Sequence, residues 1–271
     1  MDGAGCGLGT STLSSRWHSP GRGNGTWSRN VMLHGSKRIL LFDDAGQIKK
    51  IQNLFGSSLI GYYPGAEVGA SPLPPALDYS GRGFHGAYTG VTLGQTGIGD
   101  GLTCPLYDGV ADYTALPAGF RSAINVSEGT IALWARVSGV GVWTDATTRN
   151  LVFISADASN RILLRRSSTN NQLSHSHVAG GTTKSVAFTT STIDWFHTAI
   201  TWRVSDDEVK VYFNGVQQGA TQTLLGTWAG AISAANIGGE IVARIWDGYL
   251  AHLAVLNRAA TPAEVAAAAL L

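Results

Sequence analysis

The stretch IWDGYLAHLAVLNRAATPAEV, residues 245–265, decides the fold of this chain. One face of an extended strand here would carry Tyr249, Ala251, Leu253 and Val255. The residues between them are also mostly apolar, which is typical of a strand buried on both sides. The stretch therefore predicts a closing strand of the scaffold rather than an acid–histidine site built on Asp247 and His252.

A short helix is predicted directly after this strand. In the sequence TPAE, Thr261 stands at an N-cap position, Pro262 at the first helical position and Glu264 three residues after the cap. A threonine and a glutamate at this spacing can satisfy each other's backbone N–H groups, and proline is favoured at the first position. We expect one or two helical turns to close the domain.

From residue 59 onward, short runs rich in β-branched and aromatic residues alternate with turn residues at intervals of about 8–12 residues, a pattern typical of antiparallel sandwiches. The clearest strands are GTIALWARV (129–137) and WFHTAITWR (195–203). The pair Asn214-Gly215 predicts a type I′ hairpin turn within EVKVYFNGVQQG. No segment before residue 261 is predicted to form a long helix.

The N-terminal 56 residues differ from the rest. They carry seven Lys/Arg against three Asp/Glu, and residues 1–36 are rich in Gly, Ser and Asn, a composition that cannot build a core by itself. The sequence of residues 39–51 predicts a hairpin. A helix over residues 45–54 is the competing interpretation. We therefore expect a basic N-terminal arm over 1–56, which anchors the chain in an assembly, and a folded domain over 57–271.

Composition excludes several classes of function. Charged residues make up 14% of the chain and the net charge is +1, so nucleic-acid readout is not expected. No apolar run is long enough to span a membrane. The first residues lack the basic and apolar regions of a Sec-type signal peptide, and Cys6 and Cys104 do not make a disulfide framework.

Seven stretches occur in a fixed order: LIGYYP (59–64), LDYSGRGFHGAY (77–88), YDGVADY (107–113), EGTIALWARV (128–137), DWFHTAITW (194–202), VKVYFNGVQQG (209–219) and WDGYLAHLAVLNRAATPAEV (246–265). Together they resemble the laminin-G-like, concanavalin A-like lectin/glucanase domains over about residues 57–271. The resemblance implies an all-β, two-sheet antiparallel jelly roll whose last strand lies near its first. We expect it to carry an extended N-terminal arm and a short C-terminal helix.

Many of these relatives bind calcium between a D-x-S-G loop and acids on the final strand. Asp78 and Ser80 match the loop and are the candidate calcium ligands, whereas Ala251 and His252 stand where the acids would be. Glycosidases of this fold place carboxylates at alternating positions of one strand, and no such run is present. The densest acidic cluster, residues 206–208, is interpreted as a solvated turn, so we expect no enzyme activity.

A glycan site needs exposed aromatic rings beside polar partners. The candidates are Trp143, Trp228 and Trp246, each next to turn residues, with packing in or around the core as the alternative. His175 and His177 share one strand face and could pair on a transition metal, but exposed strand residues are the simpler interpretation. Asp108 and Asp112 are expected to make turn hydrogen bonds.

The first functional hypothesis is a virion structural protein of a bacteriophage, either a capsid decoration protein or a tail or head fibre module. We expect it to form homo-oligomers, with the arm contacting other virion proteins through Trp17, Trp27, Ile39, Leu41 and Phe42. The alternative is a carbohydrate-binding or adhesion module that acts outside the cell on surface glycans.

Overall fold

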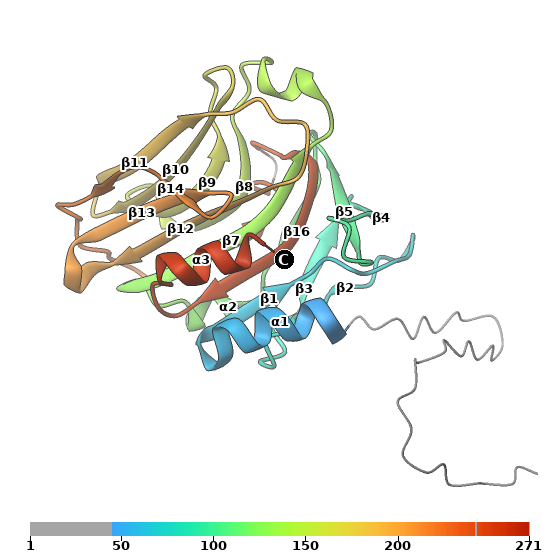
Figure 1. Ribbon diagram of the computed structural model, residues 1–271, viewed down its shortest axis with the longest axis horizontal. Coiled ribbons are helices and arrows are strands. Elements are labelled where there is room, and N and C mark those ends of the chain that lie inside the picture. Colours follow the sequence, from blue (N-terminus) through green and yellow to red (C-terminus); the bar gives the residue numbers. More distant parts are fainter. Residues whose placement is uncertain (1–44, 242, 271) are drawn as a thin grey trace, which may run out of the picture. The chain divides into compact units, whose positions relative to one another are not determined.

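The computed structural model describes residues 45–241 and 243–270, which form two antiparallel sheets around one main core (Figure 1). The predicted all-β jelly roll is confirmed. The predicted anchors Trp17, Trp27, Ile39, Leu41 and Phe42 lie outside the described residues.

The first sheet, here called the covered sheet, has eight strands. In spatial order, seven of them are β14 (Val216–Gln222), β13 (Glu208–Phe213), β12 (Phe196–Arg203), β7 (Glu128–Val137), β16 (Asp247–Leu256), β5 (Thr103–Asp108) and β4 (Thr92–Thr96). The eighth, β1 (Leu59–Tyr63), pairs with β16, which confirms that the first and last strands lie together. Figure 1 shows β16 between β7 and β5.

The second sheet, here called the open sheet, also has eight strands. In spatial order they are β11 (Thr182–Thr189), β10 (Gln172–Ala179), β9 (Asn160–Arg166), β8 (Arg149–Asp157), β15 (Ala234–Ile237), β6 (Tyr113–Ala115), β3 (Gly86–Thr89) and β2 (Pro75–Ala76). The short helix α2 (Ala118–Ala123) contributes Phe120 to the main core. Three 3-10 turns, η1 (Gly56–Ser58), η2 (Val140–Trp143) and η3 (Val204–Asp206), complete the connections.

The main core lies between the inner faces of the two sheets. It takes Ile131, Leu133 and Ala135 from β7 and Ile162 and Leu164 from β9, each at alternate positions as the strand period requires. The Asn214-Gly215 turn is also confirmed, because both residues have positive φ angles, 47° and 79°.

The final strand is buried on both sides as predicted, but its alternation is interrupted. His252 has a φ of 52°, and the pairing of β16 with β7 shifts between Ala251 and Ala254. This bulge puts Leu250 and Leu253, three residues apart, into the same core, so the predicted single face of Ala251 and Leu253 does not hold.

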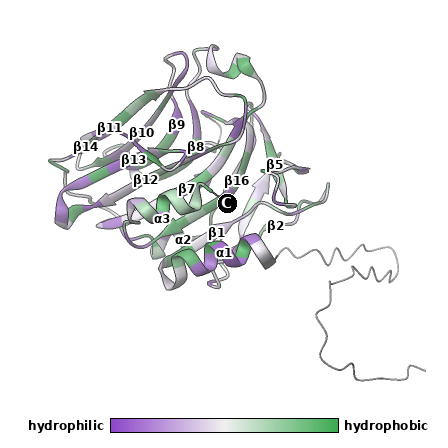
Figure 2. Ribbon diagram, in the orientation of Figure 1, coloured by the Kyte–Doolittle hydropathy of each residue, from purple (hydrophilic) through white to green (hydrophobic). Residues whose placement is uncertain are grey.

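Residues 45–55 form a helix, α1 (Ala45–Phe55), so the predicted hairpin is wrong and the competing helix is correct. Three apolar residues are buried and spaced as on one face of a helix: Ile48, Ile51 and Phe55. The alternating positions of a strand would not place these three residues on the same face. Figure 2 shows both hydrophobic and hydrophilic residues along α1. This helix of 11 residues is the short helix that the competing interpretation predicted.

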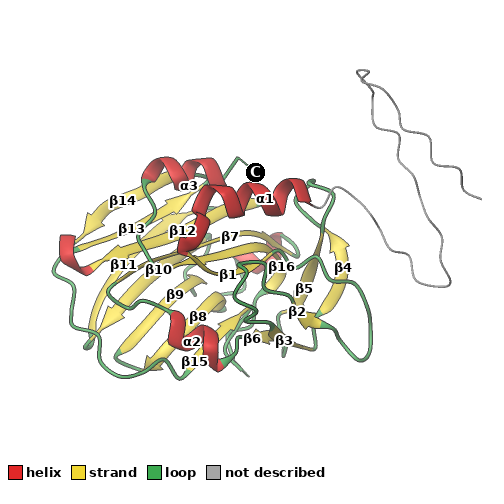
Figure 3. Cartoon of the chain, turned by 90° about the horizontal axis from the view of Figure 1, so that it is seen from below, coloured by secondary structure: helices red, strands yellow, loops and turns green. Residues whose placement is uncertain are grey.

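Helices α1 and α3 (Pro262–Ala268) build a second core on the outer face of the covered sheet. Figure 3 shows both helices on this side of the sandwich. Besides α1, this core takes Val265 and Ala268 from α3 and Tyr62 and Ala254 from the sheet. The predicted capping box at Thr261 and Glu264 is present. None of the helices in the described ranges is long and apolar enough to cross a lipid bilayer.

Candidate functional site

A groove of about 280 Å³ opens where β7 and β16 meet the loops at one end of the covered sheet. Its lining residues are Arg136, Val137, Ser138, Gly139, Val140, Ile193 and Tyr249. The volume lies just below the range of about 300–1,000 Å³ typical of small-molecule sites. It is therefore large enough for a short ligand to enter.

Arg136 stands between two aromatic rings in this groove. Its guanidinium carbon lies 4.2 Å from the ring centroid of Tyr249 and 5.2 Å from that of Trp195, both within cation–π range. Tyr249 is directly opposite Arg136 in the pairing of β16 with β7, and Trp195 comes just before β12 on the other side of β7. Arg136 makes no hydrogen bond or ion pair with any described residue. Its donors are thus oriented by the rings and free for a ligand.

Gly248 fixes the position of Tyr249. Its φ is 146°, and a Cβ atom at this position would lie 2.2 Å from the carbonyl oxygen of Arg136. Only glycine tolerates both conditions, so the sequence WDGY lets β16 approach β7 closely at this point. The aromatic residue that follows is therefore placed against Arg136.

Buried side chains hold the two loops that wall the groove. Trp143 donates its indole N–H to the carbonyl oxygen of Thr192 at 2.8 Å, which ties η2 to the loop containing Ile193. The fully buried Arg166 donates to the carbonyl oxygens of Trp143 at 2.6 Å and Thr147 at 2.5 Å. Val140 and Ile193 are left 66% and 57% exposed, so the groove has an apolar rim on fixed loops.

An ionic cluster lies next to the groove. Asp247 accepts a short hydrogen bond from Ser138, and Arg149 contacts Asp145 at 2.7 Å and Asp247 at 4.0 Å. Burial alone would raise the pKa of Asp145, but the hydrogen bond from Arg149 and its charge hold that pKa below the ordinary value. Asp145 is therefore ionised and paired with Arg149.

Two of the three predicted glycan-binding tryptophans are in the wrong place for that role. Trp143 and Trp246 are fully buried in the main core, where no sugar could stack on them. Trp228 is partly buried in the loop before β15, packs against the core and donates to the carbonyl oxygen of Gly230 at 3.1 Å. None of the three lines the groove, although Trp143 supports its wall.

The predicted calcium loop is folded around hydrogen-bond donors. The Asp78 carboxylate accepts from the N–H groups of Tyr62, Ser80 and Phe84 and from the Ser80 hydroxyl, at 2.8–2.9 Å. A calcium ion needs oxygen lone pairs, and these are already occupied. Asp78 and Ser80 thus organise the loop as it is folded here. No group of three metal-binding side chains was found among the described residues.

The histidine pair is buried rather than exposed, so neither earlier interpretation describes it. His175 contacts the hydroxyl of Thr198 at 2.6 Å, whereas His177 lies between the rings of Trp202 and Trp228. Burial lowers the pKa of His175 to about 3 and that of His177 to about 4, so both are neutral at pH 7. Their different surroundings do not form a shared metal site.

The predicted turn hydrogen bonds of two aspartates are present. Asp108 accepts from the N–H groups of Val110 and Ala111, and Asp112 accepts from that of Asp108. The acidic cluster at 206–208 is also a turn, with Asp206 bonded to Arg203 at 2.8 Å and Glu208 to Lys210 at 2.6 Å.

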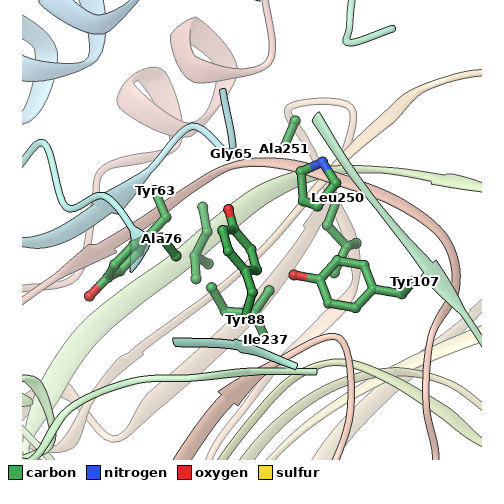
Figure 4. A pocket seen from close by; sticks show the side chains of 10 residues that line it. Tyr63, Gly65, Ala76, Tyr88, Tyr107, Ile237, Leu250 and Ala251 are labelled. Atoms are coloured by element: carbon green, nitrogen blue, oxygen red, sulfur yellow. The ribbon is translucent and has the colours of Figure 1, made fainter. Parts of the chain in front are cut away.

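A second pocket lies between the two sheets, beside the middle of β16. Figure 4 shows the rings of Tyr63, Tyr88 and Tyr107 around it, together with Leu250 and Ile237. Its volume of about 20 Å³ has room for about one water molecule. The pocket is therefore too small for a sugar.

His252 belongs to a buried polar chain under the second core. Its Nδ1 lies 2.8 Å from the Tyr62 hydroxyl and its Nε2 lies 2.9 Å from Asp100. Both ring nitrogens thus have a partner. The three residues in contact join β1, β16 and the loop between β4 and β5. This contact is structural, as the sequence pattern indicated for His252.

Sequence reasoning missed the residues that build the groove. The alternation of β7 and of β16 puts Arg136 and Tyr249 on outward positions, which a search for exposed aromatic and cationic residues on neighbouring strands could have found. The register that sets them opposite each other depends on strand pairing, which the sequence does not show.

Comparison with known proteins places the chain in a family. The family model described as the Concanavalin A-like lectin/glucanases superfamily matches residues 108–266. No curated protein sequence matches the chain.

Solved structures share the fold at low sequence identity. Domain 4 of AbnA, a GH43 extracellular arabinanase from Geobacillus stearothermophilus in complex with arabinotriose, is similar at 20% identity and a TM-score of 0.60, over 78% of this chain and 98% of that one. The botulinum neurotoxin serotype D binding domain is similar at 14% identity and a TM-score of 0.59, over 79% of this chain and 51% of that one. With the family match covering more than half of its length, the chain belongs to the concanavalin A-like lectin/glucanase superfamily.

Proposed function

We propose that this chain is a non-catalytic carbohydrate-binding module and that the groove at Arg136 and Tyr249 is its binding site. The observation that carries the proposal is the unpaired guanidinium of Arg136, held between two aromatic rings beside an open groove. Such a site offers a ring face to the C–H groups of a sugar and several N–H donors to its hydroxyl oxygens. The apolar rim at Val140 and Ile193 would exclude water around the bound sugar.

Two further points support this function. The AbnA domain, which matches along almost its whole length, was crystallised with arabinotriose. The carboxylates nearest the groove are already committed, since Asp247 bonds Ser138 and lies near Arg149, and Asp108 caps its own turn. A retaining glycosidase would need two free carboxylates about 5–5.5 Å apart.

The test is a glycan array with the full chain, followed by calorimetric titration with the best ligand and with arabino-oligosaccharides. We expect Tyr249→Ala to weaken binding by about tenfold, because it removes both the ring on which the sugar packs and the contact that orients Arg136; a factor of ten corresponds to about 1.4 kcal/mol. Arg136→Gln should weaken it at least as much.

Trp228→Ala is the matched control, because this partly buried aromatic residue lies outside the groove. Melting temperatures would show that each variant is folded. The variant Ile193→Ala changes only the exposed rim of the groove. If the chain binds no glycan, or if the Tyr249 and Arg136 variants bind as well as the wild type, the proposal is wrong. Release of shorter sugars from the bound glycan would contradict the non-catalytic part.

The more specific hypothesis of a virion structural protein stays a prediction, because it depends on residues 1–44, which are not described. Helix α1 packs on the covered sheet, so the test of an anchoring arm should keep it. Deletion of residues 1–44 should abolish incorporation into the particle or oligomer and leave the melting temperature unchanged. Normal assembly of the truncated chain would contradict the anchor.

A further inference from the structure

The outer face of the open sheet carries cations that have no partner. Ile162 and Leu164 of β9 point into the main core, so Arg161, Leu163 and Arg165 occupy the outer face. Neither arginine side chain makes a hydrogen bond or ion pair with a described residue. The Nε atom of each is buried without a partner, which leaves the terminal nitrogens at the surface. The two guanidinium groups thus lie along the sheet with their outer donors free.

Strand pairing sets amides and hydroxyls around these arginines. Arg165 is opposite Asn150 on β8 and Ser174 on β10. Midway between the two arginines, a row of paired residues crosses the sheet from β15 to β10: Asn236, Phe153, Leu163 and Ser176. About 13 Å of strand separates the two arginines at about 3.3 Å per residue. The face is thus a flat surface with two cationic points and a mostly neutral strip between them.

Two buried amides on this face also lack partners. Asn236 is 4% exposed and its Nδ2 has no hydrogen-bond partner among the described residues. Asn150 is 1% exposed; its Nδ2 bonds Glu240 at 3.1 Å, but its Oδ1 has no partner. Buried polar groups are nearly always satisfied in folded proteins. With the two arginine Nε atoms, this sheet face therefore holds four polar atoms without a partner among the described residues.

The charge around Arg165 is positive. Glu240, the carboxylate that acts on Arg165, is already bound to Arg244 at 2.6 Å. Burial lowers the pKa of Arg165, and the positive charges of Arg244 and Arg161 lower it further. An anion bound on this face would raise that pKa again. Arg165 therefore lacks a counter-ion within the described chain.

We propose that the outer face of the open sheet binds an acidic polysaccharide, with Arg161 and Arg165 holding carboxylate or sulfate groups on separate sugar units. Arginine is suited to both anions because its planar fork binds two oxygens at once. Within the neutral strip, the half-buried ring of Phe153 would contact the uncharged parts of the sugars, since Asn236 and Ser176 are only 4% and 1% exposed. A nucleic acid is a poorer match, since its phosphates demand a dense row of cations.

This site is independent of the groove, which lies at the end of the other sheet. The test uses the full chain on immobilised dextran sulfate and polygalacturonate, with uncharged dextran as the blank and a DNA duplex as the competing polyanion. We expect binding to one or both acidic polysaccharides that falls at least about tenfold in the variant Arg161→Gln/Arg165→Gln. The two polymers show whether sulfate or carboxylate is preferred.

Arg203→Gln is the matched control, because it removes one charge from an exposed position of the covered sheet. It should change binding less than about twofold. Ser185→Glu adds a negative charge at an exposed position opposite Ser176 and should also weaken binding without touching the core. Undiminished binding by the double arginine variant, equal binding to DNA, or no binding to either acidic polymer would each overturn the proposal.

Discussion

The outer face of the covered sheet lies under α1 and α3, whereas no described helix packs on the outer face of the open sheet. Under the helices, the buried imidazole of His252 has a partner at each nitrogen, Tyr62 and Asp100, although the Gln47 amide nitrogen has none. On the open sheet, the Nε atoms of Arg161 and Arg165 and the amides of Asn150 and Asn236 lack partners. An unsatisfied buried group costs about 1–3 kcal/mol, so the open sheet gives up stability at these four atoms.

The difference indicates where function lies on this sandwich. Helix cover removes a sheet face from solvent and makes it part of the core, while an uncovered face with unpaired donors is available to a ligand. The groove at Arg136 shows the same property on a smaller scale, where the covered sheet extends to the loops at its end. Unpaired arginine donors thus mark both candidate binding surfaces.

The largest expected effect is on the covered face. Phe55→Ala removes a buried ring of α1 from the second core and should lower the free energy of unfolding by about 3–5 kcal/mol. Urea denaturation at pH 7 measures it. Lys50→Ala, on the exposed side of the same helix, is the control and should change it by less than about 0.5 kcal/mol. If both variants behave alike, the helix does not contribute a second core.

A smaller loss is expected for the paired polar groups beneath the helices. Asp100→Asn weakens the contact with His252 and should cost about 1–3 kcal/mol at pH 7. Burial alone would raise the pKa of Asp100, but its hydrogen bond to His252 and the charge of that residue hold it below 3.8. A carboxyl group whose pKa is lower in the folded state than in the unfolded state stabilises the protein at pH values above its unfolded-state pKa. This stability is lost as the pH falls through the folded-state pKa.

The stability difference between wild type and Asp100→Asn should therefore be full at pH 6–7 and shrink below about pH 4. Melting curves from pH 7 to pH 2 measure it. Asp206→Asn is a suitable control, since Asp206 also has a lowered pKa, caused by Arg203, but lies at the surface. A difference that stays constant with pH would show that the ion pair with His252 does not form.

The sequence predicted what depends on local pattern. The alternation in β7 and β12, the Asn214-Gly215 turn and the capping box at Thr261 agree with what neighbouring residues predicted, whereas the bulge at His252 interrupts the predicted alternation of β16. Helix α1 was missed because residues 43–46 have the composition of a turn, which favoured a hairpin over the helical spacing of Ile48, Ile51 and Phe55. Packing on the sheet decides for the helix.

The candidate sites depend on strand register, which is why sequence reasoning found few of their residues. Tryptophan was taken as the glycan platform from its residue type, but the strand order buries Trp143 and Trp246 and leaves Tyr249 outside. Arg161 and Arg165 come from one strand, yet their amide neighbours come from β8 and β15, far away in sequence. Only the folded sheet brings these residues together.

The smallest expected effect on stability is on the open face. Asn236→Ala removes a buried amide whose Nδ2 has no partner among the described residues, so no hydrogen bond is lost. Relief of the unsatisfied group offsets the packing lost with the side chain, and the free energy of unfolding should change by less than about 0.5 kcal/mol. Binding to an acidic polysaccharide should weaken at the same time, because the amide belongs to the strip between the two arginines. Urea denaturation and the polysaccharide assay measure the two effects on one sample. A stability loss as large as that of Asp100→Asn would mean that Asn236 is part of the scaffold, and the two faces would then differ only in their helices.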